Sequence, residues 1–140
     1  MFNPSRDEVR EMFFDTWRKY REGVPLVGIE AAALDVILQH PEYHEVLGAP
    51  ERYRERDYTG EANPFLHMSL HLALEEQLSI DQPPGIRGRW QALLQRTADP
   101  HEALHEAIEC LAEMLWRSQR DGAPPDAAAY LSCLERRARS

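Results

Sequence analysis

The sequence predicts an all-α fold, a helical bundle of four main helices with additional short helices. Three observations lead to this prediction. Apolar residues recur at steps of three and four, capping residues and prolines punctuate the chain, and no segment alternates as a half-buried strand does. The 140 residues are the length of one domain. We therefore expect a single helical domain over residues 1–140.

The first helix is predicted from an apolar stripe that contains Val9, Phe13 and Tyr20. Ser5 and Glu8 form a capping box at its start, and Gly23 followed by Pro25 ends it. A second helix should run from about residue 26 to residue 39. Pro41 interrupts the pattern, since the residue before a proline is pushed out of the helical region, and a short helical turn over 42–47 follows.

The second half of the chain opens with residues 48–62, which are polar and turn-rich and predict a flexible loop. Asn63 and Pro64 then supply a cap and a proline at the first helical position. Asp99 and Pro100 repeat that arrangement further along. The helices predicted here cover about 64–80, a shorter segment from about residue 86, about 100–120, and a last segment around 130–137.

Charge and composition exclude two classes of partner. Sixteen Lys and Arg against 24 Asp and Glu give a net charge of −8, which argues against a nucleic-acid partner. The first ten residues lack the apolar run of a signal peptide, and no stretch approaches the roughly 18 apolar residues of a membrane span. We expect a cytoplasmic protein with no membrane partner. Two cysteines are too few for a disulfide framework, so Cys110 and Cys133 are interpreted as packing residues.

The six histidines form three pairs with one spacing, His40 and His44, His67 and His71, and His101 and His105. Chance placement would give only about 0.2 such pairs. Residues four apart share a helix face, where two imidazoles can converge on one metal ion. The three pairs therefore predict a metal site, with Zn, Fe, Ni or Cu as the bound ion.

Two of the pairs belong to a longer repeat, H-x-x-L-H-x-x-[LI]-E, which ends at Glu75 and at Glu109. The first histidine and the glutamate are about 12 Å apart along a helix, too far to bind one ion together. Either two metal ions bind the histidines and glutamates together, or one ion binds the histidines and each glutamate orients a histidine ring without touching the metal. Pro41 makes His40 and His44 the weakest pair. The candidate ligands are His67, His71, His101, His105, His44, His40, Glu75 and Glu109.

Two other functions stay open at this point. One is a metal-free interaction module that self-associates as a homo-oligomer through apolar helix faces, such as the face of Phe65, Met68 and Leu72. The other is a metal-dependent hydrolase or oxidoreductase, with Glu75, Glu109 or Glu102 as general base. Residues 101–105 match H-E-x-x-H, a motif of zinc hydrolases, but the corresponding segment 67–71 lacks the glutamate. The sequence leaves open whether the protein is an enzyme.

Several segments spread over nearly the whole chain carry a family resemblance: MFNPSR at 1–6, WRKY at 17–20, HPEYH at 40–44, NPFLH at 63–67 with His71, EQLSIDQP at 76–83, and 101–110 with Trp116. With these segments the chain resembles a bacterial family of unknown function, domain-of-unknown-function family 1841. The resemblance implies a small bacterial cytoplasmic protein and carries no assigned activity. Paired histidines and glutamates also resemble haemerythrin-like and di-iron carboxylate bundles, but the sequence has Glu-x-x-His only once, at 102–105, whereas those bundles carry it on two helices.

Overall fold

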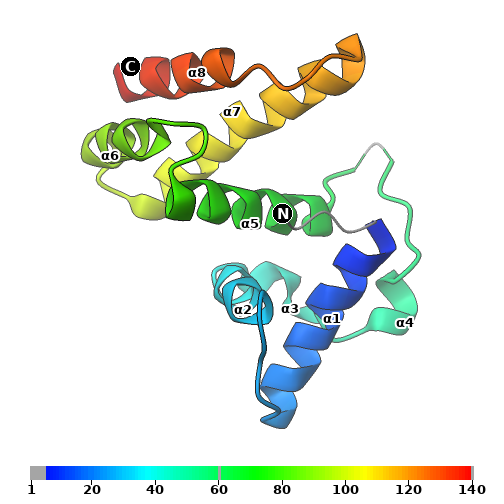
Figure 1. Cartoon of the computed structure of the whole chain (residues 1–140). Coiled ribbons are helices and arrows are strands. Elements are labelled where there is room, and N and C mark those ends of the chain that lie inside the picture. Colours follow the sequence, from blue (N-terminus) through cyan, green and yellow to red (C-terminus); the bar gives the residue numbers. More distant parts are fainter. Residues whose placement is uncertain (1–5, 60, 140) are drawn as a thin grey trace. The chain divides into compact units, whose positions relative to one another are not determined.

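The computed structural model describes residues 6–59 and 61–139, and these residues form helices and connecting turns without any strand (Figure 1). The predicted all-α class is therefore confirmed. The elements are α1 (Arg6–Glu22), α2 (Glu30–Leu38), the 3-10 helix η1 (Pro41–Tyr43), α3 (His44–Leu47), α4 (Pro50–Tyr53), α5 (Pro64–Ile80), α6 (Ile86–Thr97), α7 (Pro100–Asp121) and α8 (Ala127–Arg139).

The chain divides into two compact units, Met1–Leu72 and Ala73–Ser140. The division falls inside α5, so this one helix contributes its first half to one unit and its second half to the other. Each unit is described by itself below. The four-helix bundle and the single-domain organisation stay predictions.

The observed helix boundaries agree with the predicted ones where a capping residue precedes the helix, and they differ elsewhere. The Asn63 side chain accepts hydrogen bonds from the backbone N–H groups of Phe65 and Leu66, which fixes the start of α5 as predicted. By contrast, α2 begins at Glu30 instead of residue 26, because turns occupy the chain before it. The predicted loop at 48–62 contains the short helix α4. Ser5 of the predicted capping box lies outside the described residues.

The first unit has an apolar core in which α1 packs on α2 and α3. The rings of Phe14 and Phe65 meet edge to face at 5.3 Å. Phe65, Met68 and Leu72 lie in this core, so the face of α5 that the self-association hypothesis takes as exposed is buried. The buried core residues are Phe13, Phe14, Ala33, Val36, Ile37, Leu47, Phe65, Met68 and Leu72.

In the second unit, α8 packs on both α6 and α7 (Figure 1). The buried hydroxyl of Tyr130 on α8 donates to the side-chain oxygen of Gln77 on α5 at 2.7 Å. A disulfide joins Cys110 on α7 to Cys133 on α8.

This disulfide corrects the sequence interpretation of the two cysteines. Both side chains are buried, as expected of packing residues, but they also bond to each other. The pairing could not be recognised from the sequence, because two cysteines 23 positions apart form no known motif. Disulfides are typical of oxidising compartments, and the cytoplasmic location stays a prediction.

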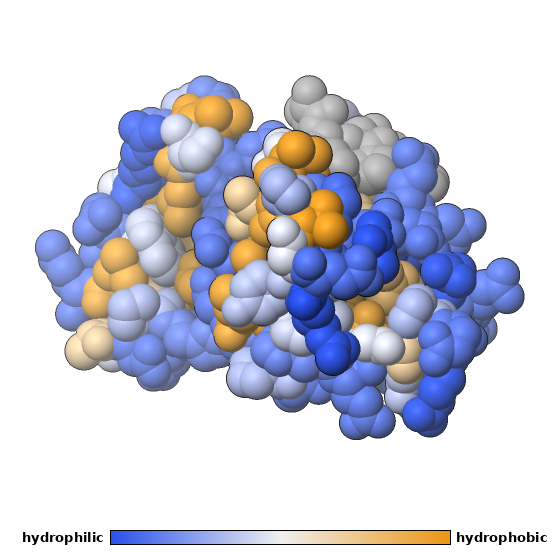
Figure 2. Space-filling view, turned by 90° about the horizontal axis from the view of Figure 1, so that it is seen from below, coloured by the Kyte–Doolittle hydropathy of each residue, from blue (hydrophilic) through white to orange (hydrophobic). Residues whose placement is uncertain are grey.

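The surface mixes polar and apolar side chains. On the face shown in Figure 2, apolar residues gather in small groups separated by hydrophilic ones. Among the described residues, no helix combines the length and apolar character that a membrane span requires.

Candidate metal centre

His40 is held in a fixed orientation at the end of α2. Pro41 follows it, and the backbone of His40 leaves the helical region with φ −128° and ψ 66°. The side chain is buried, and its Nδ1 donates to the carbonyl oxygen of Val36 at 2.7 Å. Because a carbonyl only accepts, a proton must be on Nδ1, and the neutral ring then has its lone pair on Nε2. A histidine that binds a metal through Nε2 needs this tautomer.

His67 and His71 lie one turn apart on the first half of α5. Their Nε2 atoms are 3.1 Å apart, and the ring of His71 is buried. Two nitrogens bound to one tetrahedral ion would be about 3.3 Å apart, given metal–nitrogen bonds near 2.0 to 2.1 Å. The observed separation is close to that value.

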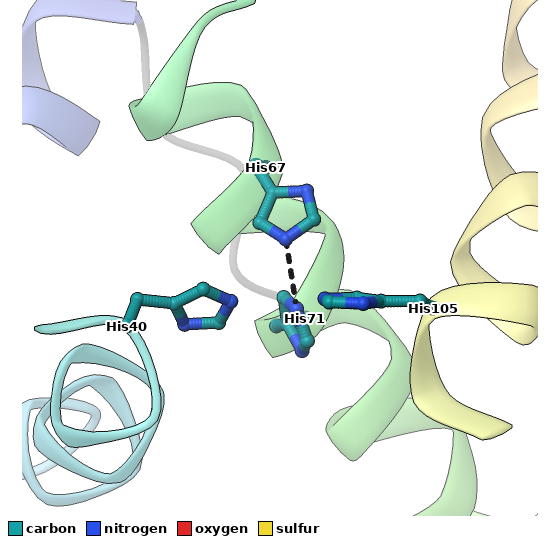
Figure 3. A group of neighbouring side chains, drawn as sticks. All are labelled: His40, His67, His71 and His105. Carbon is teal, nitrogen blue, oxygen red and sulfur yellow. Dashed lines mark hydrogen bonds between the residues drawn. The ribbon is translucent and has the colours of Figure 1, made fainter. Parts of the chain in front are cut away.

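The three rings form one cluster, which we call the histidine triad, His40, His67 and His71. The ring centroid of His40 lies 5.0 Å from that of His67 and 4.5 Å from that of His71. The His67 and His71 centroids are 4.8 Å apart. Figure 3 draws the three rings of the triad and marks the short contact between His67 and His71.

Tyr43 of η1 covers part of the triad. Its ring lies nearly parallel to that of His40, with centroids 5.4 Å apart, and 6.2 Å from the ring of His67. Burial raises the pKa of the Tyr43 phenol above its ordinary value. The phenol therefore stays neutral and brings no negative charge to the cluster.

His44 has a different role from the one the spacing predicts. Its Nε2 donates to the carbonyl oxygen of Ile37 at 2.9 Å, and its ring stacks on Trp17 with centroids 4.3 Å apart. The side chain thus joins α3 to α2 and α1. His40 and His44 are therefore a pair in the sequence only: His40 lies beside His67 and His71, and His44 contacts Ile37 and Trp17.

The remaining candidates stand outside the triad. His101 is exposed near the start of α7, and its ring centroid lies 4.3 Å from that of His105. The exposed carboxylate of Glu109 accepts from Arg137 at 2.6 Å. Glu75 is half-buried on α5 and is not a member of the group of ligand atoms around the triad.

The donor set decides which ions the cluster could hold. Among the described residues only imidazoles belong to it, without the carboxylate oxygens that Mg²⁺, Ca²⁺ and Mn²⁺ prefer. Imidazole suits Zn, Cu, Ni and Fe.

Comparison with known proteins gives a family without an assigned activity. No curated protein and no solved structure matches the chain. The family model described as a domain of unknown function, DUF1841, matches residues 5–136. That match spans nearly the whole sequence, so the chain belongs to the DUF1841 family.

Proposed function

We propose that the protein binds a divalent transition metal, and that the histidine triad supplies three of its ligands. The observation that carries this proposal is the approach of the His67 and His71 Nε2 atoms to 3.1 Å beside the His40 ring. One ion could accept the lone pairs of both nitrogens at this separation. The third imidazole comes from a different part of the chain.

A hydrogen bond between two neutral imidazoles would also explain a separation of 3.1 Å. The tautomer of His40 favours the metal. Its Nδ1–H bond to the Val36 carbonyl is the contact that metal-bound histidines usually make with their second nitrogen. Burying the polar rings of His40 and His71 side by side is costly in a purely structural core, and a bound ion offsets that cost.

The triad supplies three imidazoles, and a tetrahedral ion held by three protein ligands keeps its fourth position for water or another ligand. Tetrahedral nitrogen coordination favours Zn²⁺ among the candidate ions.

Elemental analysis of protein purified without an affinity tag tests this function. We expect about one equivalent of transition metal per chain, and a thermal midpoint that falls when a chelator removes it, because the ion binds only the folded state. Less than about a tenth of an equivalent, with no uptake of added Zn²⁺, would contradict the proposal.

The chain offers a matched pair of variants for this test. His40→Ala removes a triad ring, and His44→Ala removes a neighbouring imidazole that bonds to Ile37 and stacks on Trp17. Both variants should lose some stability. Only His40→Ala should lose the chelator-dependent change of the thermal midpoint, and equal losses in the two would count against the triad.

A further inference from the structure

A groove between α7 and α8 lies within the second unit, and the disulfide forms part of its wall. The volume of the groove is about 530 Å³, inside the range of roughly 300–1,000 Å³ that is usual for small-molecule sites. Cys110 and Cys133 both line it. Their side chains are 1% and 6% exposed, so Cys133 is the more accessible of the two. A molecule that occupies the groove lies beside the S–S bond.

Helix spacing places charged side chains next to the cysteines. On α8, Arg136 follows Cys133 by three positions, and on α7, Glu113 follows Cys110 by three positions. Residues three apart share one helix face. Because the disulfide joins these two faces, the charged groups and the bond border the same space.

Groups of both charges line the groove. Some of them pair with each other, as Arg117 does with Glu113 at 2.8 Å. Arg136 is exposed, and the five N–H donors of a guanidinium allow it to bind a carboxylate in addition to its contacts within the protein. The Asp126 carboxylate accepts from the backbone N–H of Ala129 at 3.0 Å and has further lone pairs for a cation. The charged lining residues are Arg117, Arg120, Arg136, Glu113, Asp121 and Asp126.

We propose that this groove binds small amino-acid thiols, and that they exchange with the Cys110–Cys133 disulfide in the folded protein. An amino-acid thiol carries one carboxylate and one ammonium group, which complement the two kinds of charge in the lining. Arg136 binds the carboxylate and so holds the thiol near Cys133, which lies on the same face of α8. This site is separate from the proposed metal site and does not depend on it.

The exchange begins at the more exposed sulfur. The thiol loses its proton, and the resulting thiolate attacks Sγ of Cys133 and forms a new S–S bond there. The bond between Cys110 and Cys133 breaks, and its electron pair leaves with Sγ of Cys110, which takes up the proton. The product is a mixed disulfide between Cys133 and the small molecule.

A second thiol molecule completes the reaction. Its thiolate attacks the sulfur of the bound small molecule, and the electron pair of the mixed disulfide leaves with Sγ of Cys133, which takes up the second proton. Two small thiols are thereby oxidised to one small disulfide, and the protein disulfide is reduced to two thiols. The reverse reaction restores the protein disulfide.

The test compares two thiols on the oxidised, folded protein. L-cysteine carries both charged groups, and 2-mercaptoethanol carries neither. The reaction is stopped with acid, and the protein thiols are alkylated and counted by mass spectrometry. Arg136→Gln should slow the reaction with L-cysteine about tenfold, because a charge-assisted hydrogen bond is lost, and should change the reaction with 2-mercaptoethanol by less than about twofold. Comparing one thiol across variants removes the effect of differing thiol pKa values.

Arg139→Gln is the matched control. It removes the same charge from an exposed position one turn further along α8, and Arg139 is not among the described residues that line the groove. Both thiols should react with this variant as they do with the parent.

Three results would overturn the inference. The first is an Arg136→Gln variant that reacts with L-cysteine at the rate of the parent. The second is an equal slowing with both thiols, since Arg136 would then not recognise a carboxylate. The third is a parent protein whose disulfide opens no faster than the chain unfolds, as measured by urea unfolding kinetics, because the bond would then be purely structural.

Discussion

The guanidinium of Arg10 on α1 donates to the carbonyl oxygen of Arg56 at 2.8 Å, across 46 positions of the chain. The same Nη1 also lies within hydrogen-bond distance of the carbonyl oxygens of Tyr53 and Arg54. The side chain is buried, and its Cζ lies 4.9 Å from the centre of the Phe65 ring. Burial lowers the pKa of Arg10, but an arginine stays charged at neutral pH. Within the first unit, one cation thus holds the end of α4 and the segment after it against α1.

Arg10→Met should therefore destabilise the first unit by about 2 to 4 kcal/mol, because carbonyl groups lose a charged donor. Urea unfolding measures this change. Arg18→Met is the matched control. Within the part of the chain that the structure describes, Arg18 forms an exposed pair with Glu22, so its loss should cost at most about 0.5 kcal/mol. Similar values for the two variants would show that Arg10 does not hold this segment.

Glu30 links folding stability to pH. Its carboxylate accepts from Lys19 Nζ at 2.9 Å and from the backbone N–H of Val27 at 2.9 Å. The hydrogen bond from Lys19 is the largest cause of a lowered Glu30 pKa. The folded state therefore favours the ionised form, and its contribution is present above the ordinary glutamate pKa and lost as pH falls through the lowered value.

Glu30→Gln should reduce the free energy of unfolding by about 1 kcal/mol at neutral pH. The difference from the parent should shrink as pH falls through the lowered pKa of Glu30, since the parent then protonates. Urea unfolding at a series of pH values measures this. Glu22→Gln, which removes the carboxylate of an exposed pair, should change stability by only a few tenths of a kcal/mol. A Glu30→Gln difference that stays constant with pH would contradict the interpretation.

The disulfide should stabilise the second unit. It closes a loop between positions 23 apart, for which restriction of the unfolded chain predicts about 3 kcal/mol. Replacing both Cys110 and Cys133 with Ala should lower the free energy of unfolding by about that amount. Adding reductant to the parent should have a similar effect and should leave the double variant unchanged. If the parent protein, unfolded without reductant, shows two reactive thiols in a thiol assay, the disulfide is absent.

The sequence predicted the fold where local chemistry decides it. Asn63 with Pro64 and Asp99 with Pro100 mark the starts of α5 and α7, since a cap followed by proline satisfies a helix terminus locally. The start of α2 has no such signal. Its first residue, Glu30, is fixed by Lys19 of another helix, and a contact of that kind leaves no periodic pattern.

The histidine spacing was only partly informative about the site. It identified His67 and His71, whose one-turn separation alone brings their nitrogens together. It paired His40 with His44, yet Pro41 turns the chain between them, and the histidines that lie beside His40 belong to α5. Arg10 and Tyr43 had no signal in the sequence, because their roles depend on tertiary contacts.

The bond between α7 and α8 also changes what a cut in the backbone would do. The turn between these helices, around Gly122 and Pro124, is exposed, and exposed turns are the usual sites of proteolytic cleavage. Both positions lie between Cys110 and Cys133. A nicked molecule would therefore keep α8 covalently attached and would run as one species on a non-reducing gel. The connectivity of the second unit does not depend on an intact peptide chain at this turn.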